Sequence, residues 1–412
     1  MHGKLASLGV VLAMGALAAC RPPPPGALEP VVLVRPGLEV VLNDSAHLVR
    51  GRRVGLVSNQ AGVDRRGRSG VEALREAGVD LTALFSPEHG FRGLAAPGEA
   101  VASTTDSATG LPIYSLYGRP TAPTAEILAG LDVILVDLQD VGARYYTWLA
   151  TTVDVMRAGA EHGKRVVVLD RPNPIGGAVQ GTVLDPAYAS AVGRLAVPMR
   201  HGLTLGELAR LARLDLGLTT DLVVVPVHGW RRSWTWDRTG LPFVPPSPNL
   251  RQLEALFHYP GTCLFEATAL SVGRGTDAPF RQIGAPWLDT AAVLSALRAA
   301  PIPGVRFEGV SFTPRDPDDG KYADTLVAGI RLIMTNAELY DPTHAAVVLL
   351  DRIRRRHPNL IAMDPRRFDR LAGGPALRAA IQAGEWPYRI VGSWKQSQEE
   401  YLTRRLPALL YP

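Results

Sequence analysis

From about residue 50 onward, short continuous apolar runs alternate with amphipathic stretches. The apolar runs are rich in β-branched residues and lack the polar/apolar alternation of a strand with one face in water. We therefore predict strands that are covered on both faces. The predicted strands are residues 53–57, 81–85, 133–136, 165–169 and 222–227, and a later one covers 328–334.

The stretches between these strands have helical periodicity. Within residues 147–162, Leu149, Val153 and Met156 lie on one apolar stripe. Repeated strand–helix–strand alternation is typical of a doubly wound parallel sheet, so the predicted fold class is α/β with a Rossmann-like parallel sheet domain. The other predicted helices are residues 71–77, 124–129, 204–214, 290–299 and 344–355.

The pattern changes near residue 230. Residues 230–248 hold three tryptophans and end in a Pro/Ser-rich run, which predicts a long ordered loop of a kind that is usually functional. The helices and the strand that follow predict a second, smaller α/β domain. We therefore expect a Rossmann-like domain over residues 31–285 and a smaller C-terminal domain over residues 286–412.

The first 30 residues predict a targeting segment followed by a tether. Residues 5–19 are an apolar run of signal-peptide length, too short for a ~30 Å bilayer core. The Leu-Ala-Ala-Cys junction that ends at Cys20 resembles the bacterial lipobox, whose cysteine is acylated. We expect a lipoprotein signal peptide over residues 1–20, a Pro-rich tether over 21–30, and an extracytoplasmic, membrane-anchored lipoprotein in the periplasm or at the cell surface. An ordinary cleaved secretory signal is the alternative.

Composition excludes several other classes of protein. Apolar residues make up 46% and charged residues 20% of the chain, which is typical of a globular protein. The net charge of +5 comes from scattered arginines without interleaved aromatic residues, so we expect no nucleic-acid partner. No dinucleotide fingerprint, P-loop, nucleophile elbow or H-E-x-x-H motif is present, so we predict no cofactor and no metal.

Polar loops directly follow three predicted strands, at residues 86–90, 137–146 and 170–174. In a parallel sheet such loops emerge at one carboxyl edge, where open α/β sheets bind their ligands. Carboxylates, arginines and aromatic rings at that edge suit sugar chemistry. The alternative is that Asp137 and Asp170 only cap helices and that Pro172 only turns the chain.

Several ungapped segments resemble the NamZ-type exo-β-N-acetylmuramidases, and the resemblance extends over roughly residues 31–412. It implies a glycoside hydrolase that removes N-acetylmuramic acid (MurNAc) from the non-reducing end of peptidoglycan fragments, with no cofactor. It also implies that residues 31–285 are the catalytic domain and that a cleft lies between this domain and residues 286–412. A non-catalytic cell-wall glycan-binding lipoprotein is the second hypothesis. The similar segments are residues 55–63, 85–90, 137–142, 169–177, 200–202, 247–249, 259–266, 273–276, 284–287 and 368–373.

Glycoside cleavage needs an acid that protonates the leaving oxygen, and Glu88 is our candidate, with His89 beside it to orient it. For the second carboxylate, Glu266, Asp140 and Asp170 compete. The acetamido oxygen of the substrate is a further alternative, and it would make a second protein nucleophile unnecessary.

The lactyl carboxylate of MurNAc calls for a bidentate arginine, and three arginines compete for this role. Aromatic side chains are expected to pack on the sugar rings. The predicted substrate-binding residues are Arg92, Asp140, Arg144, Tyr145, Tyr146, Asn173, Trp230 and Arg274, the competing arginines being Arg144, Arg274 and Arg92.

Overall fold

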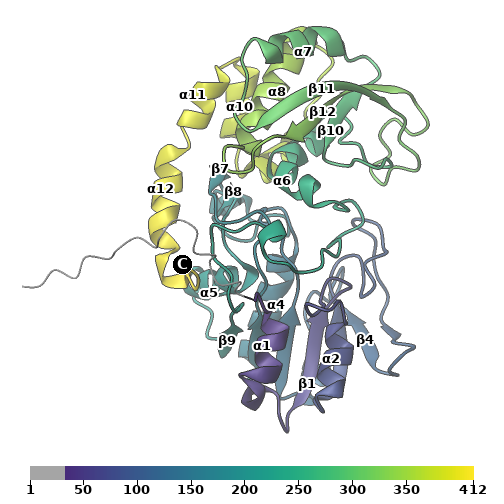
Figure 1. Cartoon of the computed structure of the whole chain (residues 1–412), viewed down its shortest axis with the longest axis vertical. Helices are drawn as coiled ribbons and strands as arrows, with labels where there is room; N and C mark the ends of the chain where they lie inside the picture. The colour runs from purple at the N-terminus through teal and green to yellow at the C-terminus, as the bar shows by residue number, and fades with distance from the viewer. Residues whose placement is uncertain (1–32) are drawn as a thin grey trace, which may run out of the picture. The chain divides into compact units, whose positions relative to one another are not determined.

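A seven-stranded sheet in the order β3-β4-β2-β1-β5-β6-β9 forms the centre of the computed structural model, which describes residues 33–412 (Figure 1). Every neighbouring pair is parallel except β3–β4. The six parallel strands follow the Rossmann order 3-2-1-4-5-6. The strands are β1 (Arg53–Ser58), β2 (Asp80–Ser86), β3 (Thr104–Thr105), β4 (Pro112–Ser115), β5 (Val133–Asp137), β6 (Arg165–Leu169) and β9 (Leu222–Val225).

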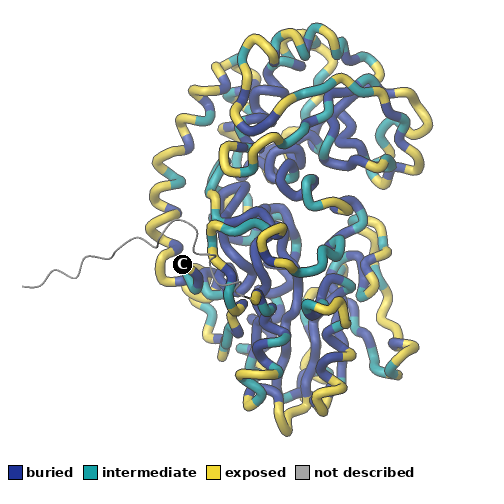
Figure 2. The backbone as a smooth tube through the Cα atoms, viewed as in Figure 1, coloured by how far each residue is buried: buried dark blue, intermediate teal, exposed yellow. Residues whose placement is uncertain are grey.

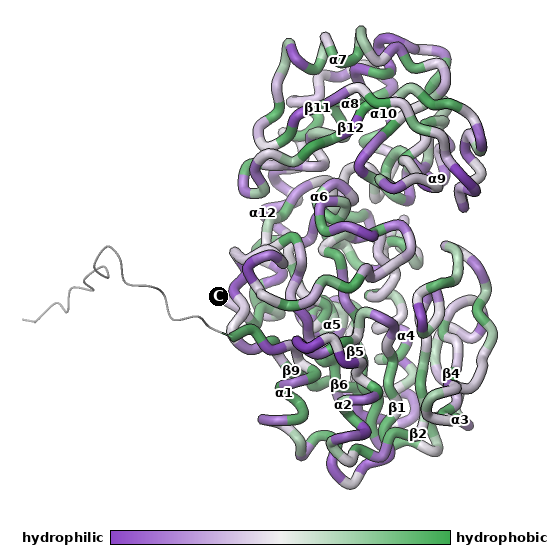
Figure 3. Tube along the Cα trace, turned by 45° about the vertical axis from the view of Figure 1, so that its right-hand side comes forward, coloured by the Kyte–Doolittle hydropathy of each residue, from purple (hydrophilic) through white to green (hydrophobic). Residues whose placement is uncertain are grey.

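The central strands are buried on both faces, as the continuous apolar runs predict. In β5, Val133 and Leu135 face one hydrophobic core, whereas Ile134 and Val136 face the other. Figure 2 shows these strands in the buried colour, and Figure 3 shows their apolar character. The helices that cover the first core are α1 (Gly37–Asn43) and α2 (Gly70–Glu76), and those that cover the second include α4 (Trp148–Glu161) and α5 (Leu205–Asp215).

The predicted α/β class with a Rossmann-like sheet is confirmed, and the predicted strands and helices agree with the structure to within about two residues. The region 230–248 is a long loop with one short 3₁₀ turn, as predicted. The sequence did not predict the strands of two to four residues, because so short a run carries too weak a periodic pattern. It also did not predict the eight-residue strand Val305–Phe312, whose mostly exposed and half-buried residues form no continuous apolar run. The other elements of this half are α3 (Ala125–Ala129), β7 (Gln180–Val183) and β8 (Pro198–Arg200).

A second, antiparallel sheet of order β10-β12-β11 lies in the C-terminal part, with α7 against it and α8 packed on α6. Residues 33–412 form one compact unit by their contacts, and the division between residues 285 and 286 stays a prediction. Among the described residues, no helix is long and apolar enough to cross a bilayer. The elements are α6 (Leu253–Thr262), β10 (Gln282–Ala285), α7 (Thr290–Arg298), β11 (Val305–Phe312), β12 (Val327–Met334), α8 (Pro342–Arg356), α9 (Pro365–Ala372), α10 (Ala376–Gln382), α11 (Pro387–Gly392) and α12 (Lys395–Arg404).

The predicted signal peptide, Cys20 and the tether lie outside the described residues. The chain is described from Leu33, and Val34 packs in a small apolar cluster with Trp230 and Tyr411. The N-terminal and C-terminal segments of the described chain are therefore joined by side-chain packing next to the sheet.

Candidate active site

A cavity of about 150 Å³ lies at the carboxyl edge of the parallel sheet, where the loops after β2 and β5 meet the segment that follows α6. Glu88 comes from the first loop, Tyr146 from the second, and Glu266 and Arg274 from the third segment. The fold therefore brings two glutamates together from positions 178 residues apart in the chain. The predicted residues that line the cavity are Glu88, His89, Tyr145, Tyr146, Glu266 and Arg274.

The half-buried Glu88 is held by neutral donors. The hydroxyl of Thr147 donates to Oε2 at 2.8 Å, and the backbone N–H of Gly98 donates to Oε1 at 3.1 Å. Burial and the neighbouring Glu88 carboxylate raise the pKa of Tyr117 to about 12. Each carboxylate oxygen of Glu88 thus has one neutral donor, and no arginine or lysine within the described chain pairs with it.

His89 is fixed by its own loop and does not hold Glu88. Its Nδ1 lies 2.8 Å from the carbonyl oxygen of Ala95, and because a carbonyl only accepts, Nδ1 carries the proton in this hydrogen bond. In the neutral form of the ring, the lone pair is then on Nε2. The backbone of His89 is left-handed at φ 68°, which is uncommon for a residue other than glycine. The ring packs edge-on to Trp148 at the start of α4.

Glu266, which also lines the cavity, belongs to a charged network. Arg274 donates through Nε to Glu266 Oε1 at 2.7 Å, and through Nη1 to both carboxylate oxygens of Asp318 at 3.0 and 2.9 Å. Asn249 also donates to Asp318, at 2.6 Å. Burial alone lowers the pKa of Arg274, but the two carboxylates outweigh burial and raise it. The two carboxylates therefore occupy the hydrogen-bonding groups of the Arg274 guanidinium. Its central carbon lies over the ring of Phe280.

The two adjacent tyrosines differ in what their hydroxyls do. The Tyr145 hydroxyl donates to the carbonyl oxygen of Pro260 at 2.9 Å, so it is used by the fold. The Tyr146 hydroxyl is buried and has no hydrogen-bond partner among the described residues, although Ser247 lies near it. Burial raises the pKa of Tyr146 well above its ordinary value. Tyr146 therefore offers the cavity an uncommitted, protonated donor.

Asp170 lies outside the cavity, where it joins two segments of the fold. Its carboxylate is fully buried and accepts the backbone N–H groups of Arg171 and Gly206 at 3.0 and 2.8 Å. It also accepts the hydroxyls of Thr204, at 2.6 Å, and Tyr411, at 2.5 Å. The structure thus places this predicted catalytic residue away from the cavity lining, as an anchor for the start of α5 and for the C-terminal segment.

Arg144 is also directed away from the cavity. Its buried guanidinium donates to the carbonyl oxygens of Thr182, Val197 and Leu371. Burial lowers the pKa of Arg144 to about 10. Both Nη groups of Arg144 donate to backbone carbonyls, and only its buried Nε has no partner among the described residues, so Arg144 presents no free fork to a substrate carboxylate.

Two further predicted residues lie away from the cavity, one on the surface and one in a small core. The Arg92 side chain is 65% exposed and pairs with Asp106 at 3.2 Å. Trp230 is buried and packs edge-on to Tyr411 at 4.9 Å between ring centroids. Neither side chain lines the cavity.

The last two predicted residues shape the loops on which the site is built. Asp140 accepts the backbone N–H of Gly142 at 2.6 Å, and Asn173 accepts that of Ile175 at 3.1 Å. Asn173 also donates to the carbonyl oxygen of Leu203 at 2.9 Å. Both side chains are buried. The polar loops do meet at one edge as predicted, but these side chains form hydrogen bonds that hold the loops in place.

Sequence reasoning missed Thr147, Asn249 and Asp318. Thr147 follows the two tyrosines directly, and Asn249 ends the segment 247–249, so both had a local signal. Asp318 had none, because it lies 44 residues after Arg274 in a loop with no regular pattern. Only the fold brings that loop to the site.

A Rossmann-like sheet that carries two glutamates and several aromatic rings in a cavity at its carboxyl edge defines an α/β protein with a site suited to a glycoside. Two family models match the chain: "Exo-beta-N-acetylmuramidase NamZ, N-terminal" over residues 54–254, and the corresponding C-terminal model over residues 257–411. The chain belongs to the NamZ exo-β-N-acetylmuramidase family.

Individual relatives support this assignment. The chain is 39% identical over 381 residues to the peptidoglycan beta-N-acetylmuramidase NamZ of Bacillus subtilis (strain 168), covering 92% of this chain and 91% of that protein. Two crystal structures of DUF1343 family proteins from Bacteroides fragilis NCTC 9343 are also similar. The one at 1.65 Å resolution has a TM-score of 0.85 and 31% identity, and covers 93% of this chain and all of its own. The one at 1.30 Å has a TM-score of 0.73 and 32% identity, and covers 92% and 99%.

Proposed function

We propose that this chain is a glycoside hydrolase that releases MurNAc from the non-reducing end of peptidoglycan fragments, with Glu88 as the general acid. The observation that carries the proposal is that Glu88 and Glu266 line one small cavity in a chain of this family. The non-catalytic glycan binder is not favoured, because the relative that matches 92% of the chain is named as a β-N-acetylmuramidase.

The surroundings of the two glutamates suggest how they divide the chemistry. Glu266 is bound to the guanidinium of Arg274, and a carboxylate paired with a cation suits a base, a nucleophile or a stabiliser of positive charge on the sugar ring. Glu88 is bound only to neutral donors, which suits a group that carries a proton to the leaving oxygen.

The bound sugar is recognised by groups that do not already form an ion pair or a hydrogen bond within the protein. Arg274 is the only one of the three candidate arginines that lines the cavity, and both sides of its fork are occupied by carboxylates. We therefore assign it the role of holding Glu266 in place and supplying positive charge near the lactyl group. The Tyr146 hydroxyl then donates directly to the substrate, because it is buried at the cavity and has no acceptor for its proton among the described residues.

The test of Glu88 compares two leaving groups. Glu88→Gln should lower kcat by about 10²–10⁴ on MurNAc–GlcNAc (GlcNAc, N-acetylglucosamine), whose sugar alkoxide needs a proton to leave. The loss should be far smaller on p-nitrophenyl MurNAc, whose phenolate leaves without one. Glu99→Gln is the matched control, because Glu99 lies on the same segment but only caps Ala96. Equal losses on both substrates would make Glu88 a base or nucleophile, and no loss on either would remove it from the mechanism.

We also propose that Cys20 is lipidated and that the protein is anchored outside the cytoplasmic membrane. The Leu-Ala-Ala-Cys junction after an apolar run of signal length supports this. One acyl chain binds membranes only marginally, so stable anchoring expects more than one chain on this residue. Cys20→Ala should give an unprocessed or soluble product in a membrane-fractionation assay, and a processed variant that still partitions with membranes would contradict the anchor.

A further inference from the structure

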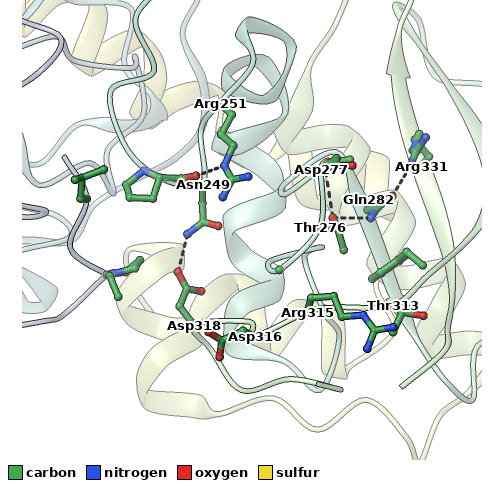
Figure 4. A pocket seen from close by; sticks show the side chains of 17 residues that line it. Asn249, Arg251, Thr276, Asp277, Gln282, Thr313, Arg315, Asp316, Asp318 and Arg331 are labelled. Atoms are coloured by element: carbon green, nitrogen blue, oxygen red, sulfur yellow. Dashed lines mark hydrogen bonds between the residues drawn. The ribbon is translucent and has the colours of Figure 1, made fainter. Parts of the chain in front are cut away.

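A second pocket of about 750 Å³ adjoins the catalytic cavity and shares two of its lining residues, Pro97 and Asn249 (Figure 4). Ligand pockets usually measure about 300–1,000 Å³, so this pocket has the size of a binding site, whereas the 150 Å³ cavity does not have room for a long glycan. The larger pocket is built from the loop after β2, the end of the long loop, and the antiparallel sheet.

Direct polar contacts join residues in the walls of the two pockets. Asp318 lines the larger pocket, and its carboxylate binds both Asn249, at 2.6 Å, and Arg274 of the catalytic cavity, at 2.9 Å. Figure 4 shows Asn249 and Asp318 directed toward each other beside the pocket. The two pockets therefore lie next to each other and share part of their walls.

Two guanidiniums in the larger pocket have no carboxylate partner within the part of the chain that the structure describes. Arg251 donates through Nε to the carbonyl oxygen of Pro248 at 2.7 Å, which leaves both of its Nη groups uncommitted. Arg331 donates through Nη2 to the buried Gln282 at 2.6 Å, and its buried Nε has no partner. Each guanidinium is thus positioned by one neutral acceptor and keeps N–H donors for a ligand.

The acidic residues of the same pocket limit what it accepts. Asp277 and Asp316 line it and form no ion pair among the described residues, while Arg315 is paired with Asp324. The pocket therefore presents unpaired charges of both signs. It suits a ligand that carries carboxylates, alone or together with an amino group, and it does not suit a neutral sugar alone.

We propose that this pocket binds the acidic substituent of the second muramic acid in a longer glycan, through Arg251 and Arg331. The proposal rests on the proposed function, because an exo-acting enzyme that holds the terminal MurNAc in the catalytic cavity must place the rest of the chain on the leaving-group side. In MurNAc–GlcNAc–MurNAc–GlcNAc, the third sugar carries the next lactyl group. Its carboxylate is free in a bare glycan, and a stem peptide with its own carboxylates replaces it in native peptidoglycan. A guanidinium fork recognises either source.

The experiment compares kcat/KM on the disaccharide MurNAc–GlcNAc with that on three tetrasaccharides. These are MurNAc–GlcNAc–MurNAc–GlcNAc, the same glycan with a stem peptide on its third sugar, and MurNAc–(GlcNAc)₃, which lacks the acidic substituent there. For the intact protein we expect at least one acidic tetrasaccharide to exceed MurNAc–(GlcNAc)₃ by about tenfold, the gain of one good charge-assisted contact. Arg251→Gln and Arg331→Gln should each reduce that advantage through KM. Arg298→Gln, at an exposed arginine outside the pocket, should not.

The outcomes separate the two proposals. Absence of MurNAc release from the disaccharide by the unmodified protein would refute the proposed function itself. Release from the disaccharide with equal kcat/KM on all three tetrasaccharides would overturn the pocket assignment, and this comparison needs no variant. An advantage only for the bare acidic glycan assigns the pocket to the lactyl carboxylate, and an advantage only for the peptide-bearing one assigns it to the stem peptide.

Discussion

Asp170 gives the sharpest test of how this fold uses its buried charges. Two backbone N–H groups and the hydroxyls of Thr204 and Tyr411 surround its carboxylate, and no part of it reaches solvent. Burial nevertheless outweighs these hydrogen bonds and raises the pKa of Asp170 from its ordinary 3.8 to about 7. The folded protein therefore binds a proton at this site at a pH where the unfolded chain does not.

The sign of the pH dependence follows from that difference. Because the pKa is higher in the folded state, the contribution of Asp170 to stability is full below pH 3.8 and is lost as the pH rises through about 7. One pKa unit corresponds to about 1.4 kcal/mol, so integration between pH 8 and pH 5 gives about 2.5 kcal/mol of added stability at the lower pH.

Asp170→Asn removes the titration and keeps the shape of the side chain. The amide still offers one oxygen to the N–H groups of Arg171 and Gly206, and the hydroxyls on the other side must turn round to accept. We expect the variant to be less stable than the wild type at pH 8, by about 1–2 kcal/mol for the disturbed hydrogen bonds. The difference in free energy of unfolding between the two proteins should then be larger by about 2.5 kcal/mol at pH 5 than at pH 8.

The assay is urea unfolding of both proteins at pH 5, 6, 7 and 8, with turnover of MurNAc–GlcNAc measured in parallel. Asp316→Asn removes an exposed carboxylate and is the control, since it should leave the gap constant. A gap that narrows as the pH falls would show that the hydrogen bonds dominate and that the reasoning about burial is wrong. Loss of turnover at unchanged stability would return Asp170 to the catalytic machinery.

Three further predictions test other parts of the structure. Thr147→Val removes a donor to Glu88 and should lower kcat on MurNAc–GlcNAc about tenfold, whereas Thr147→Ser should restore it; an unchanged rate in the valine variant would contradict the contact. Arg144→Leu leaves three buried carbonyls without their donor and should lower the free energy of unfolding by about 3 kcal/mol at unchanged KM. A raised KM at unchanged Tm would instead make Arg144 a substrate ligand. Burial raises the pKa of the Cys263 thiol well above its ordinary value, so mass spectrometry should find it alkylated by iodoacetamide only after unfolding.

The central parallel sheet could be predicted from the sequence, because a strand that is buried on both faces is a continuous apolar run. The run at 133–136 is continuously apolar, and its residues divide between two cores as that pattern requires. The apolar stripe on α4 and the loop that carries Glu88 could also be predicted, since each is a pattern of residues only a few positions apart in the chain. The predicted loops meet at one edge of the sheet because the strands that precede them are parallel.

Which polar side chains of those loops face the cavity depends on long-range contacts that the sequence does not record. Asp170 and Arg144 were predicted to be site residues because each lies on a polar loop that directly follows a predicted strand. Their partners, Tyr411 and Leu371, lie 241 and 227 residues away, and no local pattern records such a pairing. Asp318 reached the site by the same kind of distant contact. A buried charge must be paired or hydrogen-bonded. Its partner lies on whichever segment the fold places beside it, however distant that segment is in the chain.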